Sequence, residues 1–250
     1  MRLLLLNGNT DPAMTERMRG HAAATLERLG AREVTLVPAT ARFGARYVAS
    51  RAAATVAAHA VLDAVAEHAA SVDAVALACF GDPGLWAARE LSGLPVHGMA
   101  EASILAALRL APRVALLTGG AGWVPMLEEF ALLLGHGPER VIVRAVPPAG
   151  DALARDPGAA AELLARAAAD AVAEGAGAVV LGGAGLAGLG PAVSARVAVP
   201  VLDSLDCLVE AAVAGGAGRA AERGNAAPGV PTLGLGAALE AALARTGRPG

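Results

Sequence analysis

The sequence predicts an α/β fold made of two pseudo-symmetric three-layer halves, with mostly parallel sheets and the active site in the cleft between them. Two observations support this prediction. Along the 250 residues, short apolar runs alternate with alanine-rich stretches of helical length, a pattern typical of parallel sheets covered by helices on both faces. Several segments of the first half also recur, in the same order, in the second half.

The first half begins with an apolar run at residues 3–6, which predicts a strand. The turn Asn7-Gly8-Asn9 follows it. Thr10 is the predicted N-cap of the next helix, because Pro12 would lie in its first turn and Gly30 beyond its end. The other elements expected in this half are strands at residues 33–37, 73–79 and 95–98 and helices at 50–68, 85–91 and 101–110.

The second half repeats the alternation. Its expected elements are strands at residues 114–118, 141–146, 178–181 and 200–202 and helices at 123–134, 157–174 and 205–214. A last helix is expected at 235–244, and the terminus at 246–250 should fray. The predicted organisation is a first half over residues 1–105 with part of the C-terminal chain packed on it, a second half over 106–215, and a C-terminal extension with a helix over 216–250.

An internal repeat links the halves. Residues 3–7 align with 114–118, 73–79 with 177–183, and 95–101 with 200–206. The shared order indicates two similar α/β units. Because ligands bind at the carboxyl ends of strands in open α/β sheets, we expect both units to face one cleft. Its two sides would be supplied by Asn7, Cys79 and His97 and by Thr118, Gly183 and Asp203.

Composition excludes several classes of protein. With 55% hydrophobic and 17% charged residues, the chain is not a disordered or charge-rich linker. A net charge of −3 and 2% aromatic residues give no basis for nucleic-acid binding. All 20 basic residues are Arg, which excludes the Schiff-base lysine of pyridoxal-phosphate enzymes and the phosphate-loop lysine.

Two cysteines make neither a disulfide framework nor a four-thiolate zinc site, and the histidines lack metal-ligand spacing, so no metal is expected. The apolar run before Asn7 is too short for a signal peptide. The long uncharged stretch at 175–194 is broken by glycines and a proline, which argues against a membrane span. A cytoplasmic protein without membrane contact is the expectation.

Cys79 ends a predicted buried strand and enters a glycine-rich loop. A thiol there can transfer a proton or attack as thiolate, or it can be a buried structural cysteine. Cys207 lies in an apolar helical stretch and is interpreted as structural. His97 is either an acid/base with a pKa near neutral or a core histidine. Tyr47, the only tyrosine, lies in a loop that can reach the cleft.

Two turns carry potential anion-binding groups. The amides of Asn7 and Asn9, with the following helix N-terminus, can hold a carboxylate or imide, or they can simply make a turn and a cap. Thr118 and Gly119 open the corresponding turn of the second half, where backbone N–H groups can cradle an oxyanion or form a plain tight turn.

A second interpretation concerns residues 183–188, which match the dinucleotide fingerprint G-x-G-x-x-G. The segment follows a predicted strand, and Asp203 ends the next one, as that fingerprint requires. Gly190-Pro191 would leave only a short crossover helix, which weighs against a dinucleotide-dependent oxidoreductase.

Taken in order, several motifs resemble the aspartate/glutamate/hydantoin racemase superfamily, most closely its hydantoin-racemase-like branch. They are Asn7-Gly-Asn-Thr10 with Met14-Thr15, and the segments at 78–85, 95–102, 181–186 and 199–203. The resemblance implies a cofactor-independent isomerase of two similar halves that acts on a small carboxylate or cyclic imide. It also implies a homo-oligomer. One thiolate would remove the α-proton and a second thiol would return a proton to the opposite face.

This chain departs from the resemblance at one point, because Gly183 stands at the second-cysteine position. Cys79 is then the sole motif thiol, and His97 and Asp203 are candidate second acid/bases. One-thiol decarboxylases and cis-trans isomerases of the superfamily are alternatives, as is a non-catalytic ligand-binding protein. Besides Cys79, the expected substrate-binding residues are Asn7, Asn9, Tyr47, Phe80, Gly81, Thr118, Gly119, Gly183 and Ala184.

Overall fold

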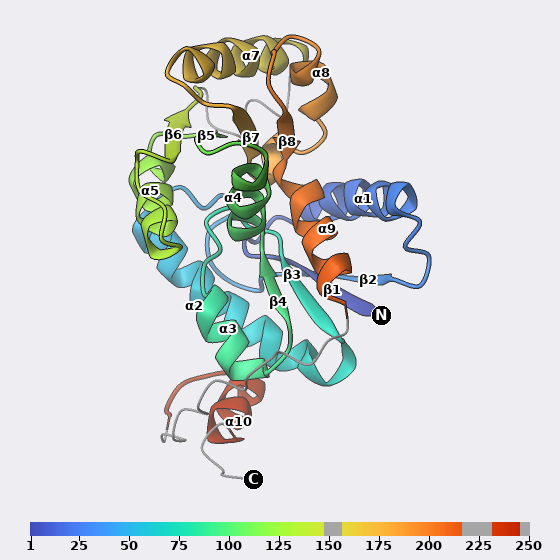
Figure 1. The fold of residues 1–250 in the computed structure, drawn as a ribbon. Helices are drawn as coiled ribbons and strands as arrows, with labels where there is room; N and C mark the ends of the chain where they lie inside the picture. The colour runs from blue at the N-terminus through green and yellow to red at the C-terminus, as the bar shows by residue number, and fades with distance from the viewer. Residues whose placement is uncertain (148–156, 217–231, 246–250) are drawn as a thin grey trace.

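The computed structural model describes residues 1–147, 157–216 and 232–245. Two four-stranded parallel sheets form the centre of the fold (Figure 1). The predicted fold class is confirmed. The first sheet has the order β2-β1-β3-β4 and the second β6-β5-β7-β8. The strands are β1 (Arg2–Asn7), β2 (Thr35–Thr40), β3 (Ala74–Leu77), β4 (Val96–Gly98), β5 (Val114–Thr118), β6 (Val141–Ala145), β7 (Ala178–Gly182) and β8 (Val201–Asp203).

The two sheets are built in the same order from the aligned segments, so the internal repeat is a repeat of structure. Near the carboxyl ends of the central strands, Leu6 pairs with Leu77 in the first sheet and Leu117 pairs with Leu181 in the second, and Cys79 and Gly183 each follow two residues later. Cys79 and Gly183 therefore leave the sheets at equivalent places.

The first sheet is covered on one face by α1 (Pro12–Leu29) and on the other by α2 (Arg51–His68) and α3 (Leu85–Ser92), with the short turn η1 (Ala69–Ser71) after α2. The expected N-cap, Thr10, is wrong by one residue. Asp11 is the cap, since its extended backbone lets its carboxylate accept from the N–H of Ala13 at 3.1 Å. Gly30 ends α1 in the left-handed conformation with a φ of 69°.

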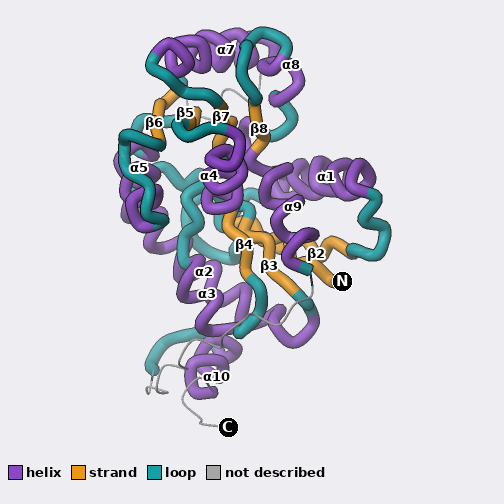
Figure 2. The backbone as a smooth tube through the Cα atoms, viewed as in Figure 1, coloured by secondary structure: helices purple, strands orange, loops and turns teal. Residues whose placement is uncertain are grey.

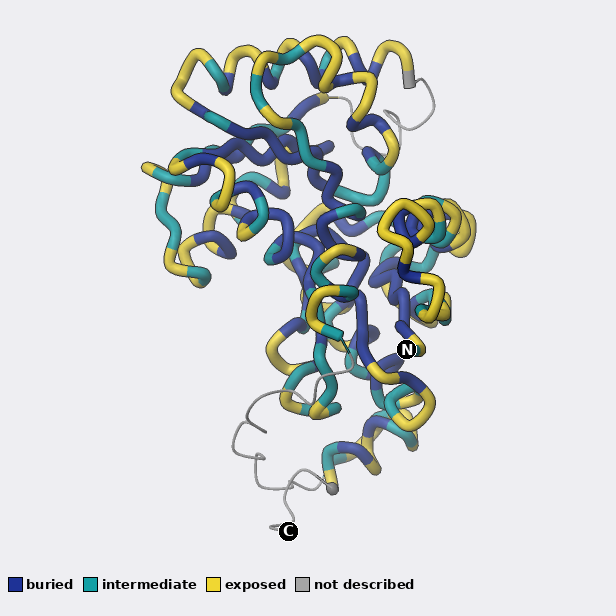
Figure 3. Tube along the Cα trace, turned by 45° about the vertical axis from the view of Figure 1, so that its right-hand side comes forward, coloured by how far each residue is buried: buried dark blue, intermediate teal, exposed yellow. Residues whose placement is uncertain are grey.

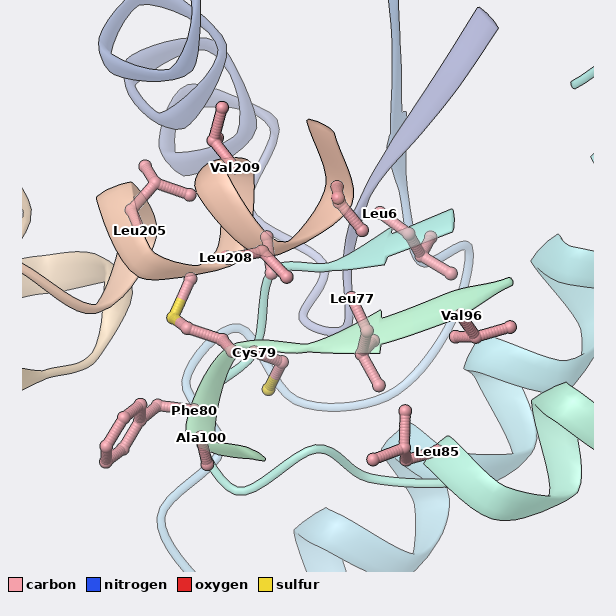
Figure 4. Close-up of a cluster of buried hydrophobic side chains, with 14 of the residues drawn as sticks. Leu6, Leu77, Cys79, Phe80, Leu85, Val96, Ala100, Leu205, Leu208 and Val209 are labelled. Atoms are coloured by element: carbon pink, nitrogen blue, oxygen red, sulfur yellow. The ribbon is translucent and has the colours of Figure 1, made fainter. Parts of the chain in front are cut away.

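The last helix of each half packs on the other half. Helix α4 (Met99–Leu110) leaves β4 and contacts β5 and β7, whereas α9 (Ser204–Gly215) leaves β8 and contacts β3, β4 and α1. The two helices also pack on each other at the centre of the molecule (Figures 1 and 2). In Figure 4, Leu205 and Leu208 of α9 lie over the sheet that carries Leu77. The predicted boundary between residues 105 and 106 thus falls inside α4.

The second sheet has α5 (Trp123–Leu133) beside α4 on one face and α7 (Pro157–Ala173) with α8 (Gly190–Ser194) on the other. A short turn, η2 (Ala184–Leu186), follows β7. Helix α10 (Ala237–Arg245) packs on α2 and α3. The rest of the expected C-terminal extension, residues 217–231 and 246–250, lies outside the described residues.

Burial explains which strands were easy to predict. Central strands β1, β3, β5 and β7 are almost fully buried (Figure 3) and appear in the sequence as continuous apolar runs. The edge strand β2 is only half buried and contains Pro38. Its weak pattern placed the predicted strand at 33–37 instead of Thr35–Thr40. None of the described helices is long and apolar enough to cross a membrane.

Candidate active site

A pocket opens between the carboxyl ends of the two sheets. Its volume of about 50 Å³ suits a small molecule, on a measure by which one water molecule needs about 10–15 Å³. Residues from both halves line it: Asn9, Met14, Tyr47, Val48, Ala78, Cys79, Phe80, Thr118, Gly119, Trp123 and residues 182–186. This is where ligands bind in open α/β sheets.

Cys79 lies at the bottom of the first half's side of this pocket, and its side chain is buried. The turn after β1 approaches it closely, since a β-carbon on Gly8 would lie 3.3 Å from Sγ. Burial, and secondarily the charge of Asp82, raises the pKa of Cys79 to about 12. The thiol of the ligand-free pocket therefore holds its proton at neutral pH.

Asp82 fastens the loop after Cys79, a role that the sequence did not reveal. Its N–H donates to the carbonyl of Cys79 at 2.9 Å. Its buried carboxylate accepts from the N–H groups of Ala100 at 3.0 Å and Glu101 at 2.8 Å, at the N-terminus of α4. Asp82 has a φ of 49°. Burial raises its pKa to about 7.

Asn7 does not line the pocket but holds Asn9, which does. The Asn7 amide donates to Oδ1 of Asn9 and to the hydroxyl of Thr15, both at 2.9 Å, and accepts from the Asn9 N–H at 3.0 Å. Oδ1 of Asn9 also accepts from the N–H of Asp11. The Asn9 Nδ2 group, by contrast, has no acceptor among the described residues. It is left available to a ligand.

Glycines let the two halves meet at the pocket. A β-carbon on Gly182 would overlap the ring of Phe80, and one on Gly81 would overlap the indole of Trp123. Gly81 itself is absent from the lining, whereas Phe80 and Trp123 belong to it. Met14, Val48 and Trp123 are pocket residues that sequence reasoning missed, because nothing in their local patterns separates them from core residues.

Gly183 faces open space. Its φ of 123° is unfavourable for any residue with a side chain, and an added β-carbon would have no heavy atom within 4 Å. Its N–H donates to the hydroxyl of Ser204 at 3.1 Å. At the position aligned with Cys79, the second half therefore presents only backbone to the pocket.

Backbone donors line the pocket. In the part of the chain that the structure describes, the N–H groups of Phe80, Gly119 and Ala184 have no hydrogen-bond acceptor. All three residues line the pocket, as does Thr118. N–H groups fixed in this way can stabilise an oxyanion without reorganising.

The two candidate second acid/bases lie outside this pocket. Asp203 caps α9 by accepting from the N–H of Leu205 at 2.9 Å, and it also accepts from the N–H of Gly188 at 2.6 Å. His97 packs its ring against Gly215 at the end of α9, and burial lowers its pKa. Asp203 therefore contacts the N-terminus of α9 and His97 contacts its C-terminus.

The dinucleotide interpretation fails on geometry. After β7 the chain enters the single turn η2 and the five-residue α8, so the segment at 183–188 does not open a long helix whose N-terminus could receive a pyrophosphate. Cys207 is buried in α9, as expected for a structural cysteine. Among the described residues, no group of three or more His, Cys, Asp or Glu side chains is arranged to hold a metal ion.

Two similar α/β halves, with a buried thiol and backbone donors between them, define a class of enzyme that handles small molecules in an inter-domain pocket. The chain belongs to the Asp/Glu/hydantoin racemase family, which matches residues 3–212. The predicted superfamily, and its hydantoin-racemase-like branch, are confirmed.

Several relatives of this chain are named as racemases. The hydantoin racemase of Pseudomonas sp. (strain NS671) is 32% identical over 66% of this chain, and the match spans 65% of that protein. The allantoin racemase of Pseudomonas fluorescens has 33% identity and a TM-score of 0.81, covering 86% of this chain and 90% of that one. A Gly74Cys-Cys188Ser variant of arylmalonate decarboxylase shares the fold, with a TM-score of 0.63 at 21% identity over 88% of this chain and 94% of that one.

Proposed function

We propose that this protein is a cofactor-independent racemase of hydantoin-type cyclic imides, including ureido-substituted ones such as allantoin. The observation that carries the proposal is the position of Cys79, a buried thiol that shares a small pocket with free backbone donors from both halves. The racemase relatives supply the reaction type, and the pocket supplies groups suited to it.

The reaction requires a base for a weakly acidic C–H next to a carbonyl. The Cys79 thiolate would take this proton, leaving an enolate-like carbanion. The charge that develops on the carbonyl oxygen would be held by N–H donors, for which Phe80, Gly119, Ala184 and the Asn9 amide are positioned. Each of these groups belongs to the chain itself, and the steps require no bound cofactor.

Binding of the imide follows from the same donor set. A cyclic imide presents two carbonyl oxygens and one or more N–H groups within a flat ring. Asn9 and the backbone N–H groups match the oxygens, while Phe80 and Trp123 supply flat apolar surface to the ring. The substrate is therefore expected to be small, planar and uncharged or singly charged.

The test is proton exchange in deuterated water, followed by NMR, with both enantiomers of 5-substituted hydantoins and allantoin and with 2-substituted malonates. Wild-type protein should exchange the C5 proton and racemise a hydantoin, whereas Cys79→Ser should racemise it about 100-fold or more slowly. Cys207→Ser is the matched control and should remain active. Full activity of Cys79→Ser would overturn the mechanism. Carbon dioxide release from a malonate without any racemisation would assign a decarboxylase instead.

A further inference from the structure

The missing second thiol leaves a chemical gap on one side of the pocket. Racemisation by two acid/base groups requires one on each face of the substrate carbanion. Gly183 offers no side chain. Asp203, whose carboxylate accepts from Gly188, and His97, whose ring packs against Gly215, both lie outside the pocket lining. Among the described residues that line the pocket, Cys79 and Tyr47 are those whose side chains carry a titratable proton.

Tyr47 crosses from the first half to the second. It belongs to the loop between β2 and α2, but its hydroxyl donates to the carbonyl of Gly119, directly after β5. A β-carbon on Gly120 would lie 3.7 Å from the hydroxyl oxygen. The phenol thus meets the pocket beside the second sheet, whereas Cys79 meets it at the end of β3 against Gly8.

The loop that carries Tyr47 is held at both ends. The N–H of Ala41 donates to the Asn7 carbonyl at 3.0 Å, and the carbonyl of Ala45 accepts from Thr10 at 3.1 Å. Ser50 caps α2 by accepting from Ala53 at 3.2 Å. Val48 is buried. These contacts position the phenol as a fixed part of the pocket rather than as a surface side chain.

We propose that Tyr47 is the second acid/base of the racemase, acting on the face of the substrate opposite Cys79. This inference rests on the proposed function. A phenol and a thiol are weak acids of comparable strength, with ordinary pKa values of about 10 and about 8.5. A hydroxyl proton also rotates about its C–O bond to suit its partner, so donation to Gly119 can give way to donation to a carbanion.

The steps balance without an oxidant or a reductant. In one direction, the Cys79 thiolate removes the C5 proton and becomes a thiol, and the Tyr47 hydroxyl donates its proton to the other face and becomes a phenolate. In the reverse direction the phenolate removes the proton and the thiol returns one. After the turnover, the Cys79 thiol loses a proton to water and the Tyr47 phenolate gains one from water. This restores the starting form.

The variant Tyr47→Phe distinguishes proton transfer on the Tyr47 side of the substrate from proton transfer on the Cys79 side. The variant should racemise about 100-fold or more slowly than wild type. The enantiomer whose proton faces Cys79 should still exchange it for deuterium with retained configuration, and the other enantiomer should not exchange. Cys79→Ser should show the opposite selectivity. Equal loss of exchange from both enantiomers, or racemisation near the wild-type rate, would overturn the role of Tyr47.

Two controls keep the test specific. Phe43 lies in the same loop, packs on His59 and is absent from the pocket lining, so Phe43→Leu should leave the exchange pattern unchanged. If wild type exchanges neither enantiomer of any substrate in the panel, the proposed function itself fails, and the role of Tyr47 falls with it.

A second measurement does not depend on deleting the hydroxyl. Because the chain contains one tyrosine, growth on 3-fluorotyrosine changes this phenol alone and makes it more acidic. One limb of the pH profile of kcat/KM should move to lower pH in both directions of racemisation. An unchanged profile would mean that the phenol carries no proton in the reaction.

Discussion

The ring of Phe80 lies against the backbone of Gly182 so closely that a β-carbon on the glycine would overlap it. Phe80 follows Cys79 in the first half, and Gly182 ends β7 in the second. This contact therefore links the position of the thiol to the second sheet. Gly182 is required here for space, since no side chain fits beneath the ring.

Gly182→Ala should lower the free energy of unfolding by about 1–3 kcal/mol through overpacking and should reduce racemisation by displacing the neighbour of Cys79. The double variant Phe80→Leu/Gly182→Ala removes the overlap. The double variant should lose less unfolding free energy than the two single variants lose in sum, because contacting residues are energetically coupled. Urea unfolding of all four proteins measures this coupling, and additive effects would show that the contact is not strained.

The pH dependence of turnover should reflect the buried thiol. Burial raises the pKa of Cys79 to about 12. At pH values below this pKa, the thiolate fraction increases about tenfold for each unit by which the pH rises. The value of kcat/KM, which reports on the free enzyme, should rise with nearly that slope between about pH 6 and pH 8. Initial racemisation rates at fixed ionic strength test this, and a plateau beginning near neutral pH would contradict it.

Substitution of Gly183 should lower the stability of the fold through backbone strain and not through a steric clash. With a φ of 123° and no heavy atom near an added β-carbon, Gly183→Ala should lose about 1–3 kcal/mol through backbone strain. Gly20 is the matched control, since an added β-carbon there also meets nothing within 4 Å but the residue is inside α1. Gly20→Ala should stabilise by about 0.5–1 kcal/mol. Thermal unfolding of both variants should show shifts of opposite sign.

Asp82 should make stability depend on pH in a defined window. Burial raises its pKa from 3.8 to about 7, so the folded state retains a proton that the unfolded state has lost. This contribution to stability is complete below about pH 4 and disappears as pH rises to about 7. Asp82→Asn should remove the dependence.

The measurement is the difference in unfolding free energy between wild type and Asp82→Asn at several pH values. Wild type should lose stability relative to the variant as pH rises through this window. Asp206 provides a control of opposite sign. Its hydrogen bonds with His21 and Thr25 outweigh burial and lower its pKa to about 2, so its contribution is lost as pH falls from about 4 to about 2. A difference for Asp82→Asn that is constant with pH would refute the assignment.

Sequence alone determined the order of strands and helices, the internal repeat and the place of Cys79 at the end of a central strand. These features are local: buried parallel strands are continuous apolar runs, and glycine-rich turns mark their ends. The resemblance to racemases, confirmed by the family match, also rests on short motifs in chain order.

Only the tertiary structure decided which residues meet. Three contacts join residues far apart in the chain. Helices α4 and α9 each pack on the opposite half, Asp82 accepts hydrogen bonds from the N-terminus of α4, and the Tyr47 hydroxyl donates to Gly119. The same long-range packing turned Asp203 to the cap of α9 and His97 to Gly215. Local patterns specify each element, but contacts between elements depend on how the two sheets face each other.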